Sequence, residues 1–221
     1  MVISSAFVPC VVVVLLGVLA MLWASRTGQK RAEYIGKPLA SAAFVTLALS
    51  QGALDHALGQ TLLAGLVLCA LGDVLLMPAD PRAFLGGIGA FLLGHVAFAI
   101  AFAQRGVSWG AAGLAALALL LVVVPVLRWL LPHVARRQPA LRGAVLAYVG
   151  VITAMVALAF GTTLSSSPAD PRWAGAAAAF FVSDLAVAHE RFASDTWTSR
   201  IWGLPLYFGS TLAFAAFSGP P

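Results

Sequence analysis

Two aspartates lie in stretches of the sequence that otherwise contain almost only apolar residues. Asp73 stands in LGDVLL and Asp184 in FFVSDLAVA. An ionised Asp in the hydrocarbon of a bilayer costs roughly 2.5–3.5 kcal/mol on insertion scales, so it persists where it is used or neutralised. Two carboxyl groups in one poorly solvated pocket are not expected both to be ionised. Such a pair would supply a general acid together with a base or cation stabiliser.

A few other polar side chains accompany these acids. Lys37 stands at the mouth of an apolar run, and Tyr207 lies within a late one. His95 shares a helical face with Phe91, Phe98 and Phe102, close to four glycines. This aromatic stripe fits two alternatives: side chains packed against a neighbouring helix, or the wall of a functional site. The charged stretch His189-Glu190-Arg191 is expected to be a solvated helix end.

Composition places the chain in a membrane. Of its 221 residues, 61% are hydrophobic and 10% are charged, and the mean hydropathy is +0.96. Soluble domains carry about 25% charged residues. The net charge of +5 comes from basic residues in short loops between apolar runs, which is typical of a membrane face and not of a nucleic-acid groove. Cys10 and Cys69 lie inside apolar runs and are interpreted as packing residues.

The apolar runs predict an all-α, polytopic bundle in a single integral membrane domain, residues 1–221. Each run is about 20 residues long, which suits a spanning helix and is too long for a barrel strand. The first run lacks a cationic start and is interpreted as a retained span, not a signal peptide. The eight predicted spans are 2–23, 36–54, 59–77, 84–104, 108–131, 140–164, 172–189 and 200–217.

The distribution of Lys and Arg predicts the orientation. Successive loops lie on alternate sides of the membrane, and nearly all basic residues are in the odd-numbered loops. The even-numbered loops hold only Arg105 and Arg172. Both termini are therefore expected on the non-cytoplasmic side. A composition rich in Ala and Arg and poor in Lys points to a bacterial inner membrane. Of the 13 basic residues, the odd-numbered loops hold Arg26, Lys30, Arg31, Lys37, Arg82, Arg128, Arg136, Arg137, Arg142, Arg191 and Arg200.

The two acids are predicted at one depth. With a rise of 1.5 Å per residue, Asp73 and Asp184 each lie roughly 6–8 Å inside the cytoplasmic boundary, and Tyr207 roughly 10 Å. His95 lies deeper. Folding the chain as four plus four spans aligns the two acids, as a parallel repeat about an axis along the membrane normal would.

Three classes of function fit these features. One is an enzyme that uses paired carboxyl groups, and another is a proton-coupled transporter with an acid relay. The third is a lipid-binding or structural membrane protein, in which loss of either Asp would change stability but no turnover. A carrier needs acids that are reachable from both faces, whereas Asp73 and Asp184 are both predicted near one face, which favours the enzyme. The four histidines show no metal-ligand spacing, and no nucleotide or cofactor fingerprint is present, so we predict no metal and no cofactor.

Four short motifs resemble the YhhN family of integral membrane proteins, in the same order and spacing. A late segment, Leu204-Pro205-Leu206-Tyr207, resembles the last span of that family, and the likeness extends from about residue 30 to 217. The motifs are Gly36-Lys37-Pro38-Leu39, Leu71-Gly72-Asp73-Val74-Leu75-Leu76, Gly89-Ala90-Phe91-Leu92-Leu93-Gly94-His95 and Phe181-Val182-Ser183-Asp184.

The resemblance implies lysoplasmalogenase activity, the hydrolysis of the vinyl-ether bond of a lysoplasmalogen to a fatty aldehyde and a glycerophospho-alcohol. The partners would be a lysophospholipid substrate and the surrounding membrane lipids. Phe98 departs from the family pattern, where we expect a Tyr. The site implied comprises Asp73 and Asp184 as catalytic residues and Lys37, His95, Ser183 and Tyr207 as substrate-binding residues.

This chemistry agrees with the residues. Vinyl-ether hydrolysis begins with proton transfer to carbon and forms an oxocarbenium ion that water captures, much as paired acids act in glycosidases. We expect one Asp to be the proton donor and the other to stabilise the cation and activate water. Ser183 is expected to hydrogen-bond Asp184, and Lys37 to meet the lipid phosphate.

Overall fold

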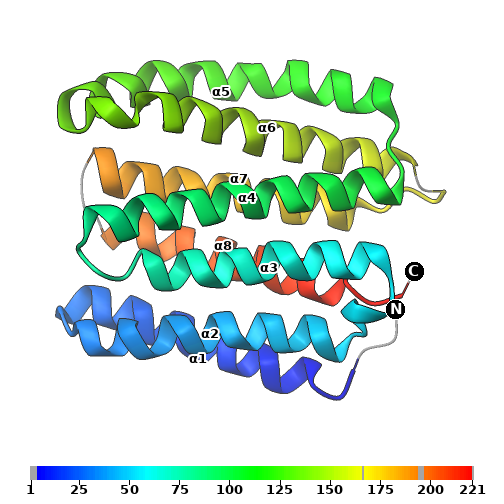
Figure 1. Ribbon diagram of the computed structural model, residues 1–221, viewed down its shortest axis with the longest axis horizontal. Coiled ribbons are helices and arrows are strands. Elements are labelled where there is room, and N and C mark those ends of the chain that lie inside the picture. The colour runs from blue at the N-terminus through cyan, green and yellow to red at the C-terminus, as the bar shows by residue number, and fades with distance from the viewer. Residues whose placement is uncertain (1–3, 166, 194–196, 221) are drawn as a thin grey trace. The chain divides into compact units, whose positions relative to one another are not determined.

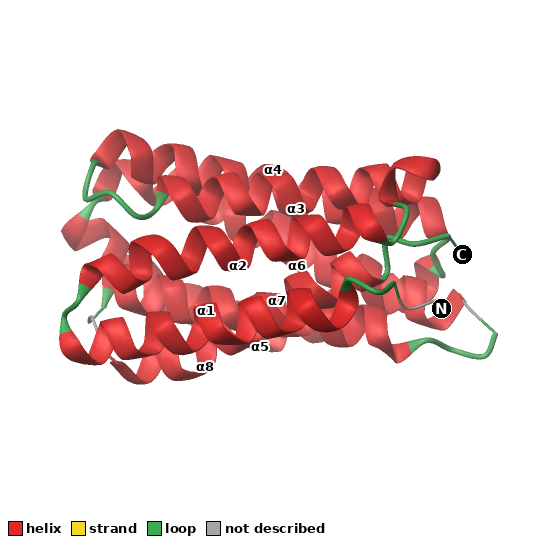
Figure 2. Cartoon of the chain, turned by 90° about the horizontal axis from the view of Figure 1, so that it is seen from below, coloured by secondary structure: helices red, strands yellow, loops and turns green. Residues whose placement is uncertain are grey.

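The computed structural model describes residues 4–165, 167–193 and 197–220 as helices joined by short loops (Figures 1 and 2). No strand occurs in these ranges, so the prediction of an all-α chain is confirmed. Two 3-10 turns, Ala53–Asp55 and Pro139–Leu141, precede α3 and α6. The eight α-helices of the described ranges are α1 (Phe7–Thr27), α2 (Lys30–Ser50), α3 (Ala57–Leu75), α4 (Pro81–Arg105), α5 (Trp109–Arg137), α6 (Arg142–Ser165), α7 (Pro171–Phe192) and α8 (Trp197–Ala216).

Among the described residues, five segments are both long and apolar enough to cross a membrane: α1, α3, α4, α5 and Pro139–Ser165, which contains α6. Helices α2, α7 and α8 have the length of a span but a more polar composition. The prediction that all eight cross the bilayer stays a prediction. Most predicted ends lie within about five residues of the observed ones. The exceptions are α2, which begins at Lys30 and not at residue 36, and α5, which continues to Arg137 through Pro132.

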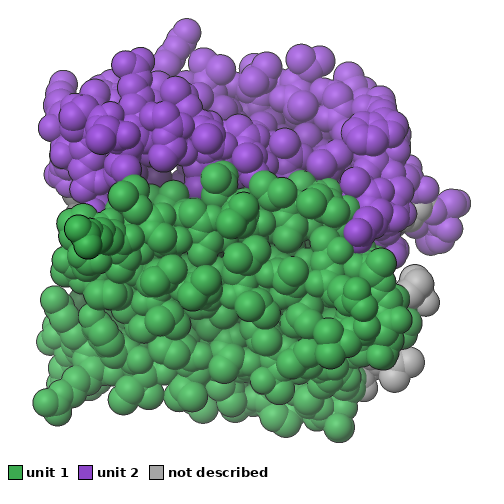
Figure 3. All heavy atoms as spheres, viewed as in Figure 1, with its two compact units in different colours: residues 1–101, 208–221 green, residues 102–207 purple. Residues whose placement is uncertain are grey.

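Residue contacts divide the chain into two compact units (Figure 3). Unit 1 comprises Met1–Ala101 and Phe208–Pro221, and unit 2 comprises Phe102–Tyr207. The boundaries fall inside α4 and α8, so each of these helices contributes to both units. The single membrane domain and the parallel repeat stay predictions.

In unit 1, α1 and α2 approach each other through small residues. A Cβ at Gly17 would lie 2.8 Å from the carbonyl oxygen of Gly36 and 2.9 Å from the Cβ of Ala40. Small residues at such crossings let helix backbones meet closely inside a membrane. The contact fixes α2 at the residue that precedes Lys37.

Glycines also bring α3 and α4 together in unit 1. The ring of Phe91 covers Gly72, where a Cβ would lie 2.7 Å from it, and the ring of Phe98 covers Gly65 at 2.5 Å. Phe98 also packs on Phe214 with ring centroids 4.6 Å apart. Of the two alternatives for the aromatic stripe, these contacts favour packing for Phe91 and Phe98.

In unit 2, the two basic residues that depart from the charge bias are both balanced locally. The guanidinium of Arg172 donates twice to the carboxylate of Asp170 at 2.8 Å, and this hydrogen bonding lowers the pKa of Asp170 below its ordinary value. Asp170 also caps α7 by accepting from the backbone N–H of Arg172. Arg105 lies over the ring of Trp173, 4.9 Å from the centroid.

We expect Gly17→Ala to destabilise the chain by about 1–3 kcal/mol, because the new methyl group must push α1 and α2 apart. Gly89→Ala is the matched control, since a Cβ there meets nothing within 4 Å and Ala is the better helix former. The measurement is the unfolding midpoint of the two variants in the same detergent. Equal midpoints would show that the α1–α2 contact is not tight.

Candidate functional site

The first polar cluster lies in unit 1 between α2 and α3. The ammonium of Lys37 lies 3.3 Å from Oδ1 of Asp73, and the hydroxyl of Ser41 donates to Oδ2 at 2.6 Å. The side chain of Asp73 is 1% exposed and that of Lys37 is 15% exposed. A buried carboxylate in an apolar helix is thus balanced by one cation and one hydroxyl from the neighbouring helix.

Local sequence explains why these groups meet. Lys37 and Ser41 are four residues apart on α2, so their side chains lie on one face of that helix. Asp73 is in the last turn of α3, next to Gly72, whose missing side chain leaves room for Phe91. The backbone of α2 is in turn held against α1 at Gly36.

The second polar cluster lies in unit 2 between α6 and α7. The phenol of Tyr148 donates to Oδ2 of Asp184 at 2.7 Å. One turn before Asp184, the ring of Phe180 meets Tyr207 edge-on, with centroids 5.4 Å apart and planes at 88°. Asp184 therefore has a hydroxyl partner from a neighbouring helix, as Asp73 has.

The predicted partnership of Ser183 with Asp184 is wrong in its geometry. The Ser183 hydroxyl donates instead to the carbonyl oxygen of Phe180, one turn back on its own helix, at 2.6 Å. Neighbouring residues on a helix point about 100° apart, so Ser183 faces away from the carboxyl group beside it. Ser183 is 1% exposed and buried in unit 2.

The remaining predicted site residues are buried in separate units. His95 is fully buried on α4 in unit 1, and Tyr207 is 8% exposed on α8 in unit 2. The structure thus brings Lys37 together with Asp73, and it places Asp184, Ser183 and Tyr207 in the other unit. Among the described residues, no group of three or more His, Cys, Asp or Glu side chains is placed to hold a metal ion.

Sequence reasoning missed Ser41 and Tyr148. Each carried a usable signal, because Ser41 is four residues beyond Lys37 and Tyr148 is the one tyrosine in an apolar run of 25 residues, 140–164. It also misjudged the end of α7. Instead of being solvated, His189 and Glu190 are half-buried and bond to residues of α8.

Comparison with known proteins gives one match. The family model of the YhhN family matches residues 32–217, which is most of the chain. No curated protein and no solved structure matches it. The matched range contains both polar clusters and begins after α1.

We expect Lys37→Met to destabilise the chain by about 3–5 kcal/mol, because it leaves the buried carboxylate of Asp73 without its counter-ion. Lys37→Met/Asp73→Asn should regain at least half of that loss. Lys30→Met, at an exposed lysine of the same helix, should change stability by less than about 0.5 kcal/mol. Unfolding titrations in mixed micelles measure all three, and additive effects of the two site substitutions would contradict the ion pair.

Proposed function

We propose that this chain, which belongs to the YhhN family, is a membrane-embedded hydrolase that cleaves the vinyl-ether bond of lysoplasmalogens. The products would be a fatty aldehyde and a glycerophospho-alcohol. The observation that carries the proposal is a carboxyl group in an apolar helix of each unit, the buried Asp73 and the half-buried Asp184, each within hydrogen-bond distance of a hydroxyl from a neighbouring helix.

The two carboxyl groups differ in their partners, which supports different roles. Lys37 supplies a positive charge that balances an ionised Asp73, and Asp184 accepts a hydrogen bond from the phenol of Tyr148. We assign proton donation to Asp184 and stabilisation of the cation to Asp73. Ser41 orients the carboxylate of Asp73 by its short hydrogen bond.

The reaction then runs in two stages. Asp184 transfers its proton to the carbon of the enol-ether double bond that is not attached to oxygen, and the carbon attached to oxygen becomes an oxocarbenium ion. Asp73 stabilises this cation and takes a proton from the water that attacks it. The hemiacetal collapses to the aldehyde as its hydroxyl proton passes to the leaving oxygen of the glycerophospho-alcohol. Asp73 then releases its proton to water, and Asp184 takes one from water, which restores the starting state.

The membrane placement completes the proposal. We infer eight spans in a bacterial inner membrane, with both termini on the non-cytoplasmic side and the two acids roughly 6–8 Å inside the cytoplasmic boundary. The vinyl ether of a lysoplasmalogen begins just below the headgroup, at about that depth. Lys37, His95, Ser183 and Tyr207 would then shape the path of the lipid, with Lys37 meeting the phosphate from its place beside Asp73.

Asp184→Asn and Asp73→Asn should each lower kcat for aldehyde release by about 10²–10⁴-fold, because each removes one half of the acid–base chemistry. Mass spectrometry of the products from purified protein and a lysoplasmalogen measures the effect. Asp80→Asn is the control, since Asp80 lies in the loop before α4 and caps that helix through a group that Asn also carries.

Near-normal aldehyde release from both site variants, at equal protein levels, would refute the assignment. An ester lysophospholipid with the same headgroup is the second substrate in that assay, and faster cleavage of the ester would refute the vinyl-ether specificity. A transporter would show proton-coupled uptake into proteoliposomes that both variants abolish, without any product formed.

Tyr148→Phe should lower kcat roughly tenfold and leave KM within about twofold, because the phenol orients Asp184 without contacting the substrate. Tyr34→Phe is the matched control: Tyr34 is exposed, and its hydroxyl donates to the carbonyl oxygen of Met77, outside both clusters. A change in KM alone would show that Tyr148 contacts the substrate and does not position the acid.

A further inference from the structure

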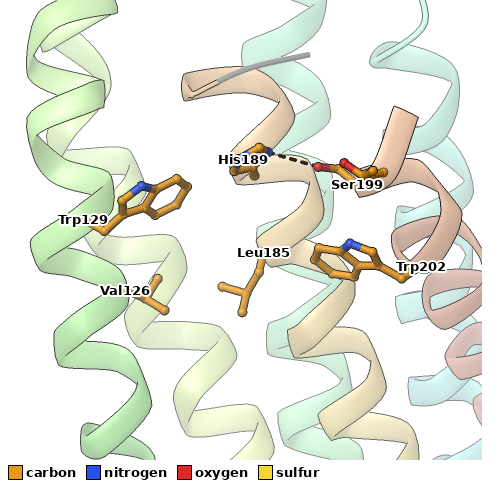
Figure 4. Close-up of a pocket in the computed structure, with 7 residues that line it drawn as sticks. Val126, Trp129, Leu185, His189, Ser199 and Trp202 are labelled. Carbon is orange, nitrogen blue, oxygen red and sulfur yellow. Dashed lines mark hydrogen bonds between the residues drawn. The ribbon is translucent and has the colours of Figure 1, made fainter. Parts of the chain in front are cut away.

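Unit 2 contains a pocket of about 440 Å³ at the end of α7 that neither carboxyl cluster uses (Figure 4). This volume is within the range of about 300–1,000 Å³ that is usual for small-molecule sites. The pocket lies between α5, α7 and α8, and its lining residues are Val126, Trp129, Leu185, His189, Thr198, Ser199 and Trp202.

Three of the seven residues that line the pocket are aromatic. Figure 4 shows the indoles of Trp129 and Trp202 reaching toward the pocket from α5 and α8, with Leu185 and His189 of α7 between them. The imidazole of His189 stacks on Trp129 with centroids 5.7 Å apart and planes at 10°. Two indoles and an imidazole thus line one pocket, and aromatic rings of this kind attract cations.

Two bonds between α7 and α8 hold this pocket in shape. Nδ1 of His189 lies 3.0 Å from the hydroxyl of Ser199, and Nε of Arg200 donates to Glu190 at 2.9 Å. Ser199 is 3% exposed, so the first bond is shielded from water. Bonds that fix the α7–α8 side of the pocket reduce the reorganisation needed when a ligand binds.

The charges around the pocket define the ligand that fits it. Glu190 is paired with Arg200 and does not line the pocket, so the lining contains no carboxylate. A primary ammonium is strongly hydrated and needs acceptors that this lining does not supply in number. A quaternary ammonium donates no hydrogen bond and is held by the faces of aromatic rings. Exposed arginines on α5 and α7 can meet an attached phosphate; they are Arg128, Arg136, Arg137 and Arg191.

We propose that this pocket binds the trimethylammonium of a phosphocholine lipid headgroup. The assignment rests on the proposed function and deepens it, because it names choline as the headgroup of the lyso-lipid substrate. Leu185 and His189 follow Asp184 by one and five residues on α7, which is about 1.5–7.5 Å along the helix axis. A headgroup held there leaves the start of the lipid chain near the level of Asp184.

The test is a binding competition on the full chain in detergent, with alkyl-ether lyso-lipids that contain no vinyl ether. Their headgroups are phosphocholine, phosphoethanolamine and phospho-3,3-dimethylbutanol, a neutral compound of the same shape as phosphocholine. We expect the choline lipid to bind at least fivefold more tightly than either of the others. Trp202→Leu and Trp129→Leu should each weaken choline binding by about five- to thirtyfold and leave the neutral analogue within about twofold.

Trp109→Leu is the matched control, because Trp109 is an exposed tryptophan at the opposite end of α5 and should change no affinity. Trp202→Phe keeps a ring and should cause a smaller loss than Trp202→Leu. Equal binding of the choline lipid and its neutral analogue by the wild-type chain would overturn the proposal even if a variant failed to fold. A preference for ethanolamine would do the same.

A last competition experiment distinguishes the two lipids that carry phosphocholine, which are the lyso-lipid substrate and the diacyl phosphatidylcholine of a bilayer. Diacyl phosphatidylcholine in excess should compete at least tenfold less well than the choline lyso-lipid, and equal competition would assign the pocket to a bilayer lipid and overturn its role in substrate binding. Because no lipid in this assay can be hydrolysed at a vinyl ether, choline-selective binding without aldehyde release from lysoplasmalogens would refute the reaction and leave the headgroup site standing.

Discussion

The free-energy cost of placing a carboxylate in an apolar helix constrains how the helices pack in both units of this chain. Each of the two acids meets polar groups of a neighbouring helix: the buried Asp73 meets Lys37 and Ser41 of α2, and the half-buried Asp184 meets Tyr148 of α6. A lone charge would cost several kcal/mol, so helices that carry the compensating groups must pack in one register. In the proposed reaction, the same contacts orient the carboxyl groups for proton transfer. Stability and the proposed chemistry then depend on the same hydrogen bonds.

Glycine supplies the second constraint, because polar groups can compensate one another only where backbones come close. Gly17 against Gly36 sets the α1–α2 distance, and Gly65 and Gly72 accept the rings of α4. In unit 2, Gly203 approaches Ala186 in the same way, where a Cβ would lie 2.5 Å from the alanine methyl group. Association of helices in a membrane relies on such close packing, because apolar side chains are as well solvated by lipid as by another helix and the hydrophobic effect does not drive the helices together.

The sequence alone predicts the helices well and their contacts poorly. Apolar runs of about 20 residues locate all eight helices. The largest errors are the start of α2, which lies at Lys30 and not at residue 36, and the end of α5, where Pro132 marks no stop inside a helix that continues to Arg137. Asp73 and Asp184 stand out because their residue type conflicts with their surroundings. The signals at Ser41 and Tyr148 are weaker, because a single sequence carries no information about which helix faces meet. The error at Ser183 has the same origin: adjacency in sequence is not adjacency on a helix surface.

The α1–α2 crossing also bears on how much of the chain is needed. The family match begins at residue 32, so α1 lies outside it, yet Gly36 on α2 rests against Gly17 and Ala20 of α1. A chain trimmed to the matched range would present the buried face of α2 to lipid, and Lys37 would sit on a helix that has lost its support on one side. The first 31 residues are in this sense a scaffold for the ion pair, supplied by the part of the chain that carries none of its chemistry.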